Sequence, residues 1–184
     1  SGKLTDTWPK AYCDTPSYKN YGGENKEVWY GEGIYVGYRW YDARKIEPLF
    51  PFGYGLSYTS FAFSDLQVED TDVEKEDIMV KVSVENTGNM AGAEVVQLYV
   101  ASPKSSFDKP EKELKGFQKV YLQPGEKTEV TLTVSKEDLA HYHTALEEFV
   151  TESGTYRILV GNSSRDIVLS KEIQVICHDP FGWN

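Results

Sequence analysis

Cysteine and histidine are scarce in this 184-residue chain, and long apolar runs are missing. The two cysteines, Cys13 and Cys177, lie near opposite ends and form no CxxC pair, so we expect two lone thiols rather than a disulfide or a structural zinc site. Among the three histidines only His141 and His143 lie close together, and two ligands without a third do not make a metal site. We therefore expect no metal and no cofactor.

Basic residues are also outnumbered, which excludes two classes of partner. The chain has 19 Lys and Arg against 29 Asp and Glu, a net charge of −10. Such a chain repels phosphate backbones and anionic lipid, so we expect neither nucleic acid nor a membrane surface as a partner. No apolar stretch is long enough to cross a bilayer. The chain begins without an initiator methionine, so we expect the interior of a longer protein, of unassigned compartment.

What the sequence does contain, from residue 61 onward, is a series of segments in which apolar and polar residues alternate. The clearest runs from Ile78 to Val84, and alternation of this kind is typical of a half-buried β-strand. Further strands are expected at 61–68 (with a bulge), 93–100, 114–122, 130–134, 149–151, 154–161 and 167–176. Turns at 86–89 and 123–126 separate them, and Ser135 is expected to cap one helical turn.

This pattern predicts an all-β fold. About seven strands with turn signals every ~8–12 residues indicate an antiparallel β-sandwich of the immunoglobulin or fibronectin type III kind. The Cys…Trp…Cys core of antibody domains is missing, which favours the fibronectin type III-like version.

The first 60 residues differ in character from the rest. Residues 1–27 are rich in Pro, Gly, Asn and Asp and are expected to be irregular, while a short strand is expected at Gly33–Tyr38. Residues 48–58 carry two prolines and two glycines among aromatics, which predicts a rigid aromatic linker. Its aromatic side chains are expected to dock the linker between two domains; they are Phe50, Phe52, Tyr54 and Tyr58.

Several motifs, taken in order, resemble a known enzyme family. They are YGEGIYVGYRWYD at 30–42, EPLFPFGYGLSYT at 47–59, VENTG at 84–88, AGAEVVQLYV at 91–100, PEKELKGFQKV at 110–120, LQPGE at 122–126 and YRILVGNSSR at 156–165. Together they resemble the C-terminal end of family 3 glycoside hydrolases of the β-glucosidase type. The resemblance runs from Ser1 to about Val175 and leaves the tail unmatched.

The resemblance implies a division of the chain and of the chemistry. Residues 1–50 would be the terminal segment of an α/β sandwich domain, 51–60 a linker, 61–177 the fibronectin type III-like sandwich and 178–184 a tail. In this family a (β/α)₈ barrel carries the nucleophilic Asp, and the α/β domain commonly carries the acid/base Glu. Retaining hydrolysis needs both carboxylates. We therefore expect no catalytic residue here, no activity from this chain alone, and the two missing domains and a carbohydrate as partners.

Four residues are candidates for the rim of the parent enzyme's sugar site. Glu32 lies between two glycines, which let a backbone approach a ligand closely. Tyr38, Arg39 and Trp40 follow in an aromatic segment whose flat faces suit sugar rings. The competing interpretation is structural: Glu32 would form a salt bridge, for example with Arg39, and the aromatics would make an interdomain contact.

A second class of function stays open, that of a stand-alone carbohydrate-binding or interaction module. Such a module would expose a row of aromatics on the sandwich. The four tryptophans lie instead at positions 8, 29, 40 and 183, outside the expected strands, which favours the supporting portion of a β-glycosidase. Because residues 1–50 would be built to pack on absent domains, we expect an exposed apolar patch there.

Overall fold

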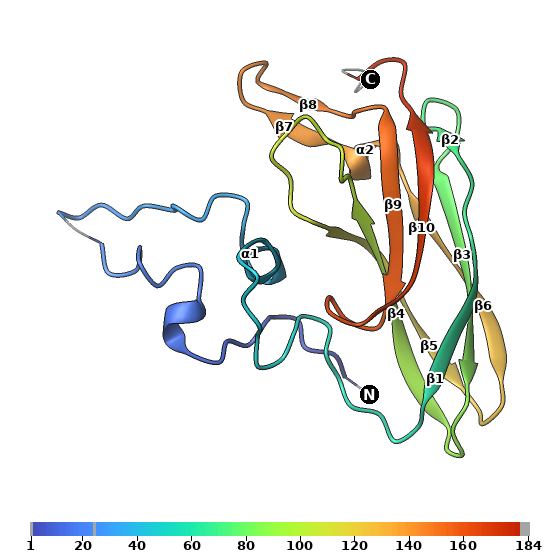
Figure 1. Ribbon diagram of the computed structural model, residues 1–184. Coiled ribbons are helices and arrows are strands. Elements are labelled where there is room, and N and C mark those ends of the chain that lie inside the picture. The colour runs from blue at the N-terminus through green and yellow to red at the C-terminus, as the bar shows by residue number, and fades with distance from the viewer. Residues whose placement is uncertain (1, 24, 181–184) are drawn as a thin grey trace.

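The protein is a β-sandwich with an extended N-terminal segment, as Figure 1 shows for the computed structural model, which describes residues 2–23 and 25–180. The strands are β1 (Phe61–Gln67), β2 (Thr71–Asp72), β3 (Ile78–Asn86), β4 (Gly92–Ala101), β5 (Glu113–Leu122), β6 (Lys127–Val134), β7 (His141–His143), β8 (Glu148–Val150), β9 (Gly154–Gly161) and β10 (Ile167–Ile176). The helices are a 3₁₀ turn (Tyr12–Asp14), α1 (Tyr38–Ala43) and α2 (Lys136–Leu139).

Two stacked sheets form the sandwich. The smaller has the order β1-β3-β6 and the larger the order β2-β10-β9-β4-β5, while β7 and β8 form a separate hairpin. The neighbours pair antiparallel, apart from the short parallel pair of β2 with β10. Seven strands are at least seven residues long (β1, β3, β4, β5, β6, β9 and β10), which confirms the all-β sandwich expected from the alternation.

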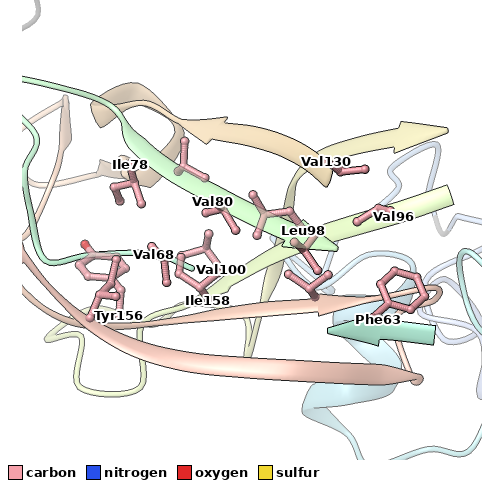
Figure 2. Close-up of a cluster of buried hydrophobic side chains, with 14 of the residues drawn as sticks. Phe63, Val68, Ile78, Val80, Val96, Leu98, Val100, Val130, Tyr156 and Ile158 are labelled. Atoms are coloured by element: carbon pink, nitrogen blue, oxygen red, sulfur yellow. The ribbon is translucent and has the colours of Figure 1, made fainter. Parts of the chain in front are cut away.

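The core lies between the two sheets and is built from the inward residue of each alternating pair (Figure 2). Along β3 the side chains of Ile78, Val80, Val82 and Val84 are at most 1% exposed, while Met79 between them is 54% exposed. Leu98 of β4 meets them from the larger sheet. Burial of each such side chain stabilises the fold by roughly 1.5–3 kcal/mol.

The local signals of the sequence produce the structures expected of them. The register of β1 against β3 shifts between Ser64 and Gln67, and Asp65 has a φ of 55°, which is the expected bulge. Ser135 caps α2: its hydroxyl accepts from the Asp138 N–H at 3.2 Å, and the Asp138 carboxylate accepts from the Ser135 N–H at 2.9 Å. This reciprocal pair satisfies N–H groups that a helix start leaves without a partner.

The strand expected at Gly33–Tyr38 is wrong. The segment forms a turn followed by α1, which begins at Tyr38. Gly33 and Gly37 have φ values of 57° and 54°, a conformation that breaks an extended backbone. The N–H of Tyr35 donates to the carbonyl of Glu32 at 3.0 Å, so the local backbone is satisfied by turns and not by a neighbouring strand. Alternation of side chains alone did not reveal this.

The segment before β1, which we call the arm (residues 2–23 and 25–60), lies beside the sandwich. In Figure 1 α1 packs near the larger sheet, and the loop before α1 reaches away from it. The linker at 48–58 is irregular, as expected, and it is held to the start of the chain by the Trp8 N–H, which donates to the Phe50 carbonyl at 2.8 Å. Within the described ranges, no helix has the length and apolar character needed to span a bilayer.

Candidate functional site

The arm covers part of the outer face of the larger sheet, where β4 places two polar side chains. Gln97 is 3% and Tyr99 0% exposed. The Gln97 amide donates to the carbonyl of Asn162 at 2.7 Å and to that of Gly53 at 3.4 Å, and it accepts from the Tyr99 hydroxyl at 2.6 Å. A Cβ at Gly53 would lie 2.4 Å from the Gln97 oxygen, so this close approach requires glycine. The arm and the sandwich are thus joined by buried hydrogen bonds.

An ion network also ties α1 to the sandwich. The Asp42 side chain is only 4% exposed, and it binds Lys112 at 2.5 Å and Arg165 at 2.9 Å. The Arg165 guanidinium also donates to the Ile46 carbonyl at 3.0 Å. Because a buried carboxylate is costly without partners, these two cations fix the position of the helix.

Tyr38, the first of the rim candidates on α1, faces the sandwich. Its hydroxyl accepts from the Leu114 N–H of β5 at 2.8 Å. Its ring packs against Phe52 at 5.2 Å and edge-on against Tyr99 at 5.9 Å between centroids. The side chain is therefore engaged in the contact between arm and sandwich.

Arg39 and Glu32 do not form the salt bridge that the structural interpretation proposed. Arg39 pairs instead with Glu113 of β5 at 2.9 Å. Glu32 accepts from the Asn20 side-chain amide at 3.2 Å. The turn at 31–34 leaves Glu32 in the loop before α1, whereas α1 turns Arg39 toward β5.

Trp40 contacts other residues of the arm. Its indole N–H donates to the carbonyl of Asp14 at 3.0 Å, and the Arg44 guanidinium lies 4.7 Å above its ring. Of the other aromatics in this segment, Tyr41 is buried and Tyr35 donates to Asp108, a hydrogen bond that raises the Tyr35 pKa to about 12. Trp40, Tyr41 and Tyr35 thus hold the arm in place.

The loop before α1, which we call the tip (residues 15–23 and 25–34), exposes its aromatics. Tyr21, Trp29 and Tyr30 are 78%, 72% and 81% exposed. With Glu32 and Val28 they border a shallow hollow of about 430 Å³. The exposed apolar patch expected for residues 1–50 is present. Of the four rim candidates, Glu32 borders this hollow, and the other three lie on α1.

The histidines and cysteines of the described residues do not gather into a cluster of possible metal ligands. His141 and His143 both lie against the Phe107 ring, at 4.0 and 5.0 Å between centroids. Neither ring nitrogen of His141 has a hydrogen-bond partner there, and no cluster of metal-ligating side chains is found in the described ranges. Burial lowers the His141 pKa, and Lys109 lowers it further. Cys13 and Cys177 are free thiols, as expected.

Several known proteins contain a region that is similar to this chain. Residues 94–164 match the model of the fibronectin type III-like domain. The chain is 53% identical over 176 residues to the thermostable β-glucosidase B of Acetivibrio thermocellus, covering 95% of this chain and 23% of that protein. Among solved structures it matches the Bifidobacterium adolescentis GH3 β-glucosidase with a TM-score of 0.90 and 40% identity, over 95% of this chain and 26% of that one.

The chain resembles the C-terminal portion of family 3 glycoside hydrolases. A further match, β-glucosidase 3B from Thermotoga neapolitana in complex with α-D-glucose, has a TM-score of 0.89 and 47% identity, over 96% of this chain and 24% of that one. The chain spans about a quarter of the length of these relatives. Because 95% or more of this chain is covered, the arm and the sandwich both have counterparts in these two structures.

Two residues that join arm and sandwich, Asp42 and Arg165, were not found from the sequence. Asp42 and Arg165 lie 123 positions apart in the numbering of the chain, and nothing in the sequence pairs them. One signal was present: Gln97 interrupts an otherwise apolar run in β4. A polar residue in such a strand indicates that its face is covered and that its amide needs partners.

We expect Asp42→Ala to lower the free energy of unfolding by about 3 kcal/mol, because it leaves Lys112 and Arg165 without their carboxylate. The measurement is urea unfolding followed by far-UV circular dichroism. The control is Glu172→Ala, which removes an ion pair to Arg157 whose two side chains are about half exposed, and which should change little. Equal effects of the two variants would contradict the anchoring role of Asp42.

The half-buried His141 predicts a loss of stability in acid. Its folded-state pKa lies below the ordinary value of 6.5, so the unfolded chain binds the proton more readily. Stability should be unaffected above that pH and should fall as the pH drops through it. We expect His141→Phe, with a ring that does not titrate, to show a shallower fall between about pH 7 and 5 than the wild type. Tyr142→Phe, which keeps both histidines, should follow the wild type in urea unfolding.

Proposed function

We propose that this chain is the supporting portion of a family 3 enzyme that hydrolyses β-glycosidic bonds, with β-glucosides as its substrates. The observation that carries the proposal is the match to proteins named as β-glucosidases over both the arm and the sandwich. The portion would keep the arm in a fixed conformation against the remaining domains, which are a barrel and an α/β sandwich domain.

The hydrolytic chemistry is proposed to reside in those other domains. A retaining glycosidase needs two carboxyl groups about 5–5.5 Å apart, one to attack and one to protonate. The buried carboxylates of the described chain are Asp42 and Glu94, and each is bound to cations: Asp42 as above, and Glu94 to Lys3 at 2.6 Å. Both carboxylates are engaged in structural ion pairs, which supports placing the hydrolytic pair in the other domains.

The division of the chain is proposed at the boundaries expected from the sequence: 1–50, 51–60, 61–177 and 178–184. The start of β1 at Phe61 and the end of β10 at Ile176 support the limits of the sandwich. Residues 181–184 of the tail, which include Trp183, lie outside the described residues.

The four rim candidates are proposed to serve the sugar site in two ways. Glu32, beside the exposed rings of the tip, would meet the substrate or its entrance. Tyr38, Arg39 and Trp40 would position the tip, since their polar groups already bind the sandwich or the arm. No residue of this chain is proposed as catalytic, and no metal or cofactor is required by the proposal.

The alternative is a stand-alone carbohydrate-binding or interaction module. It is favoured by exposed aromatics on the sandwich itself: Phe117 and Tyr121 on β5 are 67% and 64% exposed. The arm argues against it, because Trp8 and Trp29 are exposed there, as a docking segment requires, and not on the sandwich.

The test replaces the matching region of the Acetivibrio thermocellus relative with this chain. We expect the chimera to hydrolyse an aryl β-glucoside with most of the kcat of the parent enzyme, and we expect the isolated chain to have no activity. The parent with the region deleted is the control. Hydrolysis by the isolated chain, or a chimera that folds like the parent without activity, would refute the proposal.

In the same chimera, Glu32→Gln tests the rim. We expect KM to rise and kcat to change little, because a rim contact contributes to binding before and during the reaction alike. Glu27→Gln is the control, because Glu27 is an exposed carboxylate of the tip that does not border the hollow. If both KM and kcat are unchanged in the Glu32 variant, Glu32 is not a rim residue. A large loss of kcat with KM unchanged would indicate a catalytic role instead.

A further inference from the structure

A second exposed apolar surface lies where the linker meets the edge of the larger sheet. We call it the shelf, defined by Leu56, Tyr58, Phe117, Lys119 and Tyr121. Leu56 and Tyr58 are 77% and 91% exposed. Leu56, Tyr58, Lys119 and Tyr121 border a hollow of about 930 Å³. The shelf is therefore concave as well as apolar.

The strand β5 presents the shelf because its side chains alternate. Val120 and Leu122 point into the core and are 8% and 2% exposed. Phe117, Lys119 and Tyr121 point outward on the same face. β5 is an edge strand of its sheet, a position that proteins protect from unwanted pairing. Two outward aromatics at such an edge do not serve the sandwich core.

The composition of the shelf is that of a protein interface. Interface cores are enriched in Tyr and Phe and depleted of charge. The chain has a net charge of −10, yet the shelf contains no acid and a single cation. Within the described part of the chain no ion pair of Lys119 is found, whereas Lys81, Lys115 and Lys127 of the sandwich each have one. A docked partner would present an apolar face with an acceptor opposite this ammonium.

The shelf is continuous with the aromatic contact that joins the two ends of the arm. Leu56 borders a second hollow that extends past Tyr54 and Phe50 to Trp8 and Gly2. Trp8 packs edge-on against Phe50 at 6.1 Å, and Phe50 packs against Tyr54 at 5.0 Å. One apolar band thus runs from the first described residues to the edge of the sandwich.

We propose that the shelf is a docking surface for the remaining domains of the family 3 enzyme. The inference rests on the proposed function. It adds a second contact, on the sandwich itself, to the one made by the tip. The occupant follows from length and continuity: this chain spans 23% of its Acetivibrio thermocellus relative, and the hollow that Leu56 borders joins the shelf to the exposed Trp8 of the arm. Tyr58 and Tyr121 would lie at the centre of the contact, where such residues contribute most.

The test compares chemical footprints of the isolated chain and of the full-length chimera. Hydroxyl-radical labelling read by mass spectrometry should modify Tyr58 and Tyr121 readily in the isolated chain and several-fold more slowly in the chimera. Lys119 should lose its reactivity toward acetylation in the same way. Tyr142, on the β7–β8 hairpin and 51% exposed, is the control and should react equally in both.

The outcomes separate the two proposals. An active chimera in which Tyr58 and Tyr121 remain as reactive as in the isolated chain would overturn the shelf and leave the proposed function standing. A chimera without activity or fold would overturn both. If cello-oligosaccharides protected Tyr58 and Tyr121 in the isolated chain, the shelf would be a sugar-binding surface. If a higher concentration of the isolated chain protected them, the shelf would bind a second copy. Either result would overturn the proposal.

Tyr121→Ser provides a second measurement. We expect it to lower the melting temperature of the chimera more than that of the isolated chain, because the ring is buried only after docking. Tyr142→Ser should have the same small effect on both proteins. Equal shifts for Tyr121→Ser in chimera and isolated chain would contradict docking at the shelf.

Discussion

The arrangement of the arm depends on one buried carboxylate. Asp42 is held by Lys112 and Arg165, which come from two different connections of the sandwich, before β5 and between β9 and β10. Because a carboxylate at this depth is stable only with both charges in place, α1 has one position on the sheet. Tyr38 and Arg39 follow from that position, and so does the direction in which the tip leaves the sandwich.

Most of the sandwich was predictable because its strands are specified locally. The alternation from Ile78 to Val84 determines which face of β3 is buried, and the turn and cap residues mark where elements end. The same reasoning was wrong at Gly33–Tyr38, where alternating aromatics have no neighbouring strand and two glycines adopt positive φ. Period-two patterns predict strands only where a partner edge exists, and that is a tertiary property.

The candidate site was predictable only in part, since it is made of contacts between distant segments. The sequence singled out Glu32, Tyr38, Arg39 and Trp40, and the structure gives each a particular partner that the sequence did not specify. It did not reveal the layer formed by Gln97 and Tyr99 under the arm, because the Gln97 amide donates to backbone carbonyls. Backbone acceptors carry no residue identity, so no sequence pattern points to them.

The turn between β9 and β10 is under an unusual length constraint. The Asn162 carbonyl accepts from Lys3 and Gln97, the Ser164 N–H donates to the Phe52 carbonyl, and Arg165 binds Asp42. One inserted residue would displace all of these groups from their partners at once. The turn between β7 and β8 carries no such set of long-range bonds among the described residues, so inserted or deleted residues are far better tolerated there during divergence.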